Sequence, residues 1–261
     1  MEIPQWLLGP TPVCPCGDTL CCTPASPAGT GVPNTDYVLF ITAASTSTCG
    51  PTALAYSQVC QRDEFDKPTV GRINVCPTTI PEDTGGVPRH ITVVLHEAMH
   101  ALGFGQWWRF RDIDTLAPQT PRDGALRPAP QHRVQYTCNG PTYFADFPSD
   151  STVQYFAERD MLQCTAVSER FNTHSCVRKL VGPNTVSASR WYFDCPTIQG
   201  AELENHPVAD CNVDTNHLEQ RIFLGTLMTA FIDYEFNVDP VTLAIMHDSG
   251  WYLPVYSAAD P

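Results

Sequence analysis

Three short apolar runs near the start of the chain have the composition of strands. They cover residues 36–44 (DYVLFITAA), 51–61 (PTALAYSQVCQ) and 71–77 (GRINVCP). The first run is almost continuously apolar, which predicts a buried strand. The polar sequence DEFDKPT at residues 63–69 separates the second and third runs and predicts an exposed turn.

A strong helical pattern follows at residues 91–104, with the sequence ITVVLHEAMHALGF. Its apolar residues recur with the period of a helix face, and Gly103 stands where the helix is expected to end. The predicted face consists of Ile91, Val94, Leu95, Ala98, Met99 and Leu102. Weaker helical patterns occur near residues 151–162 and 185–193.

The rest of the chain alternates between irregular and apolar segments. Residues 1–34 are rich in Pro, Gly, Thr and Cys and predict a loop-like lead-in, and residues 112–130 predict an irregular excursion. Two apolar segments, at residues 217–231 and 240–254, are expected to pack on the core. We find no internal repeat and no coiled coil.

Composition and charge exclude several classes of protein. With 261 residues, 43% of them apolar, the chain can form a sizeable packed core. Its 15 Lys and Arg against 28 Asp and Glu give a net charge of -13, which repels phosphate backbones and argues against a nucleic-acid partner. No stretch reaches the roughly 18 apolar residues of a membrane-spanning helix, so no transmembrane segment is expected.

Twelve cysteines are spread along the chain, and none of them forms a CxxC pair. This number predicts disulfides made in an oxidising compartment, with buried reduced cysteines as the alternative. Four lie in the lead-in, where disulfides are favoured over a metal cluster: Cys14, Cys16, Cys21 and Cys22. The N-terminal sequence MEIP has no basic region before an apolar run, so no signal peptide is expected within this chain.

His96, Glu97 and His100 form an HExxH motif within the predicted helix. A spacing of four residues puts both imidazoles on one face about one turn apart, as two ligands of a tetrahedral zinc require. Glu97 would take a proton from zinc-bound water, whose pKa the metal lowers to about 7. The motif predicts a hydrolytic zinc site, and the alternative is a helix with two structurally satisfied histidines.

The two histidines of the motif leave a third protein ligand to find. In the pattern HExxHxxGxxH a His follows three residues after the Gly, but here that place after Gly103 is taken by Gln106. The third ligand must therefore come from farther along the chain. The candidates are the carboxylates and His132, His174, His206, His217 and His247.

Six sequence blocks resemble the leishmanolysin and leishmanolysin-like metalloproteases, in the order in which that family has them. They cover most of residues 34–254. The blocks are CGPTALAYSQVCQRDEFDKPTVGRINVCP, HEAMHALGF, FRD with TPRD, CPTIQGAELEN, HLEQR with a later LMT, and TLAIMHDSGWY.

The resemblance implies a metzincin active site in which a long insertion separates the helix-ending Gly103 from the third His. Residue by residue, His96 and His100 match the helix ligands, and Glu97 matches the catalytic base. His217 in HLEQR matches the distant third ligand of a single Zn²⁺ per chain.

The implied fold is α+β, of the metzincin type. We expect a twisted mixed sheet and the active-site helix in an N-terminal catalytic lobe, residues 35–105. The C-terminal lobe, residues 106–261, is expected to be loop-rich, mainly helical and disulfide-containing, and to carry the third ligand and a Met-turn.

Met246 is the predicted Met-turn residue because it stands shortly before a Gly that can reverse the chain; Leu243 is the alternative position. The thioether would form a packing floor under the imidazoles, and an ordinary core methionine is the other interpretation. Glu219, two residues after His217, is a candidate to orient that imidazole, with exposed ion-pairing as its alternative. The GAELEN block at residues 200–205 has no role that its sequence suggests.

The function implied by the resemblance is zinc-dependent hydrolysis of peptide bonds in polypeptide substrates, outside the cell or at its surface. Two alternatives are a cell-surface adhesion protein of the same fold with reduced or no catalysis, and a zinc hydrolase of non-peptide amides or esters. The intact HExxH favours the peptidase. This chain shows no clear propeptide, Cys-rich C-terminal domain or lipid anchor of the family, and Leu218 replaces the aromatic residue often found after the third His.

Overall fold

The computed structural model describes nine stretches of the chain, which divides into two compact units, Met1–Gly103 and Phe104–Pro261. The predicted lead-in, apart from Asn34, and the predicted excursion at residues 112–130 lie outside these stretches. The described residues are 34–63, 67–79, 89–105, 133–137, 142–146, 151–157, 176–204, 216–231 and 237–259.

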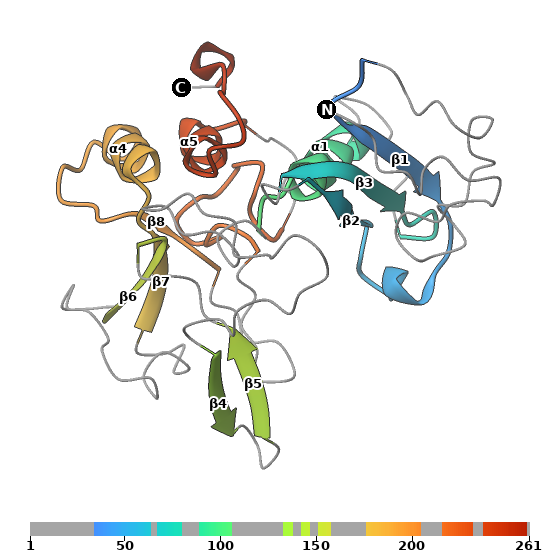
Figure 1. The fold of residues 1–261 in the computed structure, drawn as a ribbon, viewed down its shortest axis with the longest axis horizontal. Helices are drawn as coiled ribbons and strands as arrows, with labels where there is room; N and C mark the ends of the chain where they lie inside the picture. The colour runs from blue at the N-terminus through green and yellow to red at the C-terminus, as the bar shows by residue number, and fades with distance from the viewer. Residues whose placement is uncertain are drawn as a thin grey trace. The chain divides into compact units, whose positions relative to one another are not determined.

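The first unit is built on a three-stranded sheet of order β1-β3-β2 (Figure 1). Its strands are β1 (Val38–Ala43), β2 (Ala55–Arg62) and β3 (Pro68–Val75), which confirms the three predicted strands. β1 runs parallel to β3 and β2 runs antiparallel to it, so the sheet is mixed.

The burial of these strands differs from the prediction. β3 is central and is buried along most of its length, whereas β1 is only half-buried, with Ile41 59% exposed. The prediction of a buried first strand is therefore wrong. An edge strand in a small sheet keeps apolar residues near solvent, and an apolar run alone does not reveal the strand's place in the sheet.

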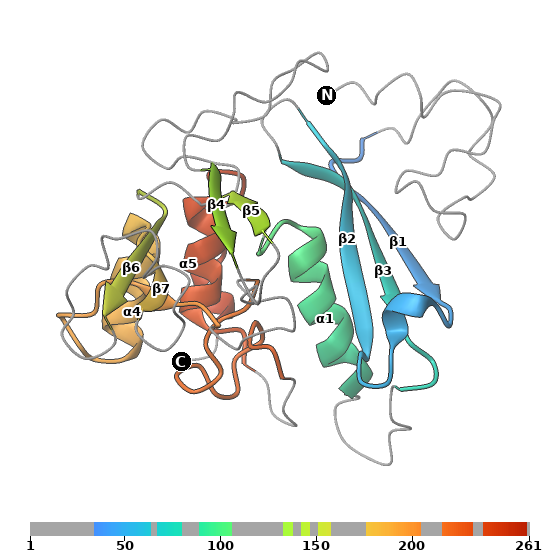
Figure 2. The ribbon, with the colours of Figure 1, turned by 90° about the horizontal axis from the view of Figure 1, so that it is seen from below.

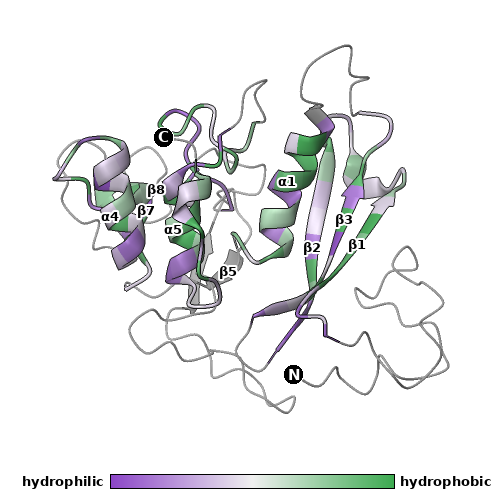
Figure 3. Ribbon diagram, turned by 90° about the horizontal axis from the view of Figure 1, so that it is seen from above, coloured by the Kyte–Doolittle hydropathy of each residue, from purple (hydrophilic) through white to green (hydrophobic). Residues whose placement is uncertain are grey.

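Helix α1 (Arg89–Ala101) packs against β2 and β3, as Figure 2 shows. The predicted helix is confirmed, but its buried side is not the predicted apolar face. Ile91 is 48% exposed, while Val93 and the polar His96 and Glu97 are buried. Figure 3 shows hydrophilic positions between hydrophobic ones along α1. The helix buries two polar residues of its HExxH motif, which a purely apolar pattern cannot anticipate.

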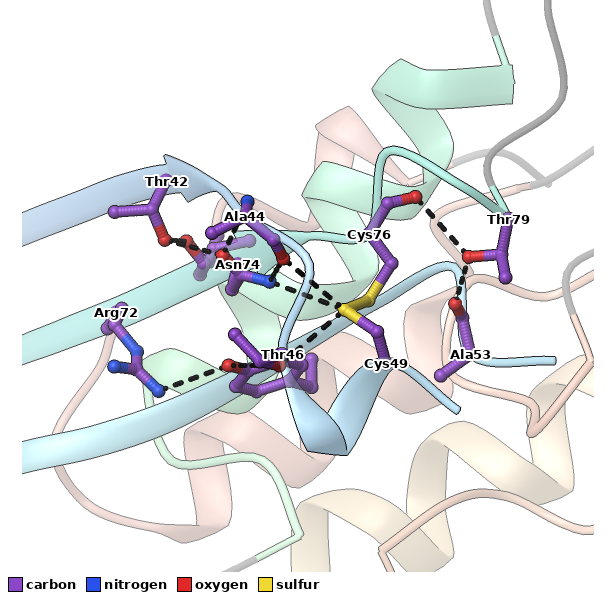
Figure 4. Close-up of a disulfide and its surroundings, with 11 residues drawn as sticks. Thr42, Ala44, Thr46, Cys49, Ala53, Arg72, Asn74, Cys76 and Thr79 are labelled. Atoms are coloured by element: carbon purple, nitrogen blue, oxygen red, sulfur yellow. Dashed lines mark hydrogen bonds between the residues drawn. A yellow bond between two sulfur atoms is a disulfide. The ribbon is translucent and has the colours of Figure 1, made fainter. Parts of the chain in front are cut away.

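A disulfide between Cys49 and Cys76 closes the end of the sheet (Figure 4). Cys49 ends the short helix η3 (Ser47–Cys49), and the bond joins residues 27 positions apart, which stabilises the fold by about 3 kcal/mol. Beside it, the amide of Asn74 accepts from Thr42 Oγ1 at 2.8 Å and donates to the Ala44 carbonyl at 2.9 Å.

Of the other cysteines in the described stretches, Cys60 and Cys176 are also disulfide-bonded and Cys195 is free. The prediction of disulfides is thus confirmed. Cys60 lies in the first unit and Cys176 in the second, so each unit has a cysteine engaged in a disulfide.

The second unit contains a hairpin of β4 (Arg133–Thr137) and β5 (Thr142–Asp146). A separate sheet has the order β6-β7-β8, with antiparallel pairing throughout. Its strands are β6 (Val153–Ala157), β7 (Cys176–Leu180) and β8 (Ala201–Glu202). The helix predicted near residues 151–162 is wrong: β6 is a strand because β7 supplies a pairing partner from well downstream, which local periodicity does not show.

Two helices, α4 (Pro183–Tyr192) and α5 (Pro240–Asp248), lie side by side in this unit (Figures 1 and 2). α4 confirms the helix predicted near residues 185–193, and a single turn, η5 (Tyr256–Ala258), follows α5. The described part of this unit contains both strands and helices, and the expected mainly helical lobe stays a prediction. None of the described helices has the length and apolarity to cross a membrane.

Asp239 begins α5 as its N-cap. Its carboxylate accepts hydrogen bonds from the backbone N–H of Thr242 at 2.8 Å and from the Thr242 hydroxyl at 2.6 Å. Complete burial raises the pKa of Asp239, against the lowering effect of these two bonds. This cap fixes the start of α5. The other end of α5 carries a second buried carboxylate.

That second carboxylate, Asp248, caps the start of α4. It accepts from the backbone N–H groups of Asn184 and Thr185 at 3.0 and 2.8 Å, and from their side chains at 2.7 and 2.6 Å. α4 has no capping side chain of its own, because its N-cap is Gly182. A Cβ on Gly182 would collide with the Asp248 carboxylate, so the glycine makes room for a cap supplied by α5.

We expect Asp248→Ala to lower the free energy of unfolding by about 3 kcal/mol or more, because it leaves four donors without their acceptor at a buried site. Chemical denaturation monitored by circular dichroism measures this change. Asp36→Ala, which removes an exposed carboxylate, is the matched control and should change stability by less than about 0.5 kcal/mol. Equal stability of the two variants would contradict the capping role.

Candidate metal centre

Two imidazoles converge on one side of α1. Nε2 of His96 and Nε2 of His100 are 3.1 Å apart, and the rings meet edge to face with centroids 4.8 Å apart. Nitrogens that share a tetrahedral zinc at 2.0–2.1 Å lie about 3.3 Å from one another. The observed separation is close to that value, so the helix presents a preformed pair of donors.

Glu97 lies between the two histidines in sequence and is only 9% exposed. A largely buried carboxylate on the same helix as two paired imidazoles is a candidate for exchanging a proton with water. α1 therefore carries two candidate metal donors and a candidate base in one segment of the first unit.

The C-terminal end of α1 is fixed to the sheet next to His100. The hydroxyl of Tyr37 donates a hydrogen bond to the Ala101 carbonyl at 2.7 Å, and burial raises the pKa of Tyr37, which keeps this donor protonated. The phenol fits because residue 71 on β3 is Gly: a Cβ there would collide with the Tyr37 hydroxyl. The helix thus cannot slide along the sheet without breaking this contact.

Immediately after Ala101 the chain leaves the helix at Gly103. The Gly103 N–H donates to the His100 carbonyl at 2.9 Å, and Gly103 has a φ of 107°. This left-handed conformation suits glycine and ends α1 just beyond its second histidine.

His217 lies in an extended segment of the second unit that is paired on both sides. Leu218 forms an antiparallel bridge with Leu203 and a parallel bridge with Thr229. The His217 carbonyl accepts from the N–H of Glu204 at 2.9 Å, and the Leu218 N–H donates to the Met228 carbonyl at 2.8 Å. The backbone of His217 is therefore held from two directions.

Gly105 brings the chain that follows α1 against this segment. Its φ is 89°, and a Cβ at this position would lie 3.0 Å from Cβ of Asn216, the residue before His217. His96 and His100 belong to the first unit and His217 to the second.

Of the other four candidate histidines, the structure describes only His247. His247 lies in α5, where its Nδ1 is 3.1 Å from the Tyr256 hydroxyl. The other three candidate histidines lie outside the described residues: His132, His174 and His206.

The predicted Met-turn position also differs from what the structure shows. Met246 lies inside α5, in a helix and not in a turn. Met228, which the sequence pattern did not indicate, is fully buried, and its carbonyl accepts a hydrogen bond from the Leu218 N–H. The available signal was its place in the LMT part of the block that begins with His217, only eleven residues away, whereas Met246 follows much later.

The paired imidazoles on α1 and the glutamate between them in sequence define a candidate metal site of the HExxH class. The family model for leishmanolysin, a peptidase family designated M8, matches residues 6–120 and 144–261, so the chain belongs to the leishmanolysin family of metallopeptidases.

Similar proteins occur in several animals. The chain is 30% identical over 249 residues to a leishmanolysin-like peptidase of Caenorhabditis elegans, covering 94% of this chain and 35% of that protein. It is 31% identical over 239 residues to a leishmanolysin-like peptidase of Drosophila pseudoobscura pseudoobscura, covering 89% and 32%. It is 30% identical over 240 residues to the ciliated left-right organizer metallopeptidase of Mus musculus, covering 90% and 28%. The chain spans about a third of the length of these relatives.

Proposed function

We propose that this chain is a zinc-dependent endopeptidase that hydrolyses peptide bonds in polypeptide substrates. The observation that carries the proposal is the pair of Nε2 atoms 3.1 Å apart on α1, with Glu97 between the two histidines. Membership of a metallopeptidase family supports the same function.

The donor set fits zinc. Three imidazoles form a ligand set known from catalytic zinc sites, which leave a fourth position for water or substrate. We assign His96, His100 and His217 as the ligands of a single ion. Zinc bound there would polarise the substrate carbonyl and lower the pKa of a water to about 7.

Glu97 is the proposed general base and general acid. Its carboxylate accepts a proton from the attacking water and then delivers that proton to the nitrogen of the departing amine. Because Glu97 neighbours the ligand His96 on a rigid helix, it needs no rearrangement to serve both transfers.

Met228 is the proposed methionine beneath the ligands, in place of Met246. Its carbonyl holds the backbone next to His217, and its side chain is completely buried, as a packing floor requires. The disulfide between Cys49 and Cys76 supports a setting outside the reducing cytosol, at the cell surface or beyond it.

Metal removal tests this function. We expect the purified chain to contain close to one zinc per molecule and to cleave an unstructured protein such as casein. 1,10-phenanthroline should abolish cleavage, and added zinc should restore it. The isomer 1,7-phenanthroline, which cannot chelate, is the control. Cleavage that persists in a zinc-free sample would refute the proposal.

A further inference from the structure

Three buried glutamates surround the backbone of His217. Glu202 ends β8, Glu204 follows it, and Glu219 lies two residues after His217; they are 7%, 5% and 5% exposed. Glu202 and Glu204 belong to the GAELEN block. Such a concentration of buried carboxylates is costly unless cations and hydrogen bonds compensate for it.

The backbone brings these residues into register. The N–H of Glu219 donates to the Glu202 carbonyl at 3.0 Å, and the N–H of Glu204 donates to the His217 carbonyl at 2.9 Å. Between them, Leu203 and Leu218 form the bridge and are fully buried. Since side chains alternate along extended segments, the three glutamates and His217 lie on the side of the bridge opposite the two leucines.

The exposed side chain of Arg221 forms ion pairs with two of these three glutamates. Its Nη2 lies 2.6 Å from Glu202 Oε1, and its Nε lies 3.7 Å from Glu219 Oε1. The guanidinium thus links a carboxylate from each of the two paired segments. Glu219 Oε1 also accepts from the Arg221 backbone N–H at 3.2 Å, so the turn after His217 is held by the same carboxylate.

We propose that Arg221, acting through Glu202 and Glu219, is a positioning residue for the third zinc ligand, and that the GAELEN block serves as the partner strand of His217. The inference rests on the proposed function. His217 is far in sequence from the helix ligands, so its ring is only as well placed as the backbone that carries it. An ion pair across that backbone bridge limits how far His217 can move. The planar guanidinium of an arginine can contact two carboxylates at once, whereas the ammonium of a lysine is a single point charge.

Arg221→Ala in the full chain tests the role through metal binding. We expect zinc affinity, measured by competition with a chelator, to fall about tenfold to a hundredfold, the range typical of lost outer-shell support. Arg221→Lys should recover part of the loss. The control is Arg190→Ala, which removes the same charge from α4, where Nε donates to the Ile198 carbonyl at 2.9 Å, and it should bind zinc as the wild type does.

Hydrogen exchange in the metal-free chain supplies a second readout that does not depend on zinc. Arg221→Ala should exchange the amide protons of Glu204, Leu218 and Glu219 about tenfold faster, because these form the bridges around His217. Amides in β3 report whether the rest of the fold is intact and should be unchanged.

The outcomes separate the two proposals. Unchanged exchange at the three amides, or faster exchange with wild-type zinc affinity, would overturn the positioning role while the proposed function stands. A wild-type chain that binds no zinc would overturn both.

Discussion

Glu97→Gln is expected to abolish most peptide cleavage while leaving zinc content near one per chain. The amide has almost the same size as the carboxylate but cannot accept a proton from water at neutral pH. General acid and base catalysis contributes about 10²- to 10⁴-fold, so kcat/KM should fall by at least that factor. Cleavage of a fluorogenic peptide and metal analysis of the same sample measure both quantities.

Glu97→Asp provides a graded comparison for this prediction. It keeps a carboxylate but withdraws it by one methylene, so it should retain more activity than the amide, with the same zinc content. Since Glu97 is buried on α1, circular dichroism spectra should show that each variant is folded. Full activity of Glu97→Gln would show that another group transfers the proton.

His217→Ala is expected to lower zinc affinity by about two to three orders of magnitude. Zinc binding contributes about 10–16 kcal/mol in sites with four protein ligands, so one ligand supplies a few kcal/mol of it. Chelator competition measures the affinity, and cleavage should be lost with the metal.

His247→Ala is the matched control for His217→Ala. His247 is a histidine of the same unit whose Nδ1 lies 3.1 Å from the Tyr256 hydroxyl. It should bind zinc as the wild type does. Wild-type affinity in His217→Ala would show that the third donor lies elsewhere in the chain.

Much of the first unit could be predicted from local sequence patterns. The three strands and α1 follow from apolar runs and from a helical period, since both signals depend on neighbouring residues. The HExxH motif is equally local: four residues of helix place two imidazoles one turn apart, and the structure shows their nitrogens 3.1 Å apart. By contrast, which side of α1 is buried depends on β2 and β3, and the apolar stripe of the helix did not indicate it.

The roles proposed for His217 and Met228 could not be predicted from local sequence patterns. Spacing and residue type left five histidines and the carboxylates open as the third donor, and resemblance to a family was needed to favour one of them. The Met-turn was predicted at Met246 because a glycine follows shortly after it. A nearby glycine is an ambiguous signal for a turn, and the structure places Met246 inside α5. Met228 is recognisable only once its carbonyl is seen to pair with the backbone next to His217.

The sequence by itself therefore determined the helix with its two candidate metal donors, the candidate base and the disulfide-rich character, because each depends on spacing or composition along a single segment. Tertiary structure alone decided the strand at β6, the cap that α5 supplies to α4, and the part played by GAELEN beside His217. These features arise from pairing between distant segments, whose free energy depends on contacts that no single stretch of sequence contains.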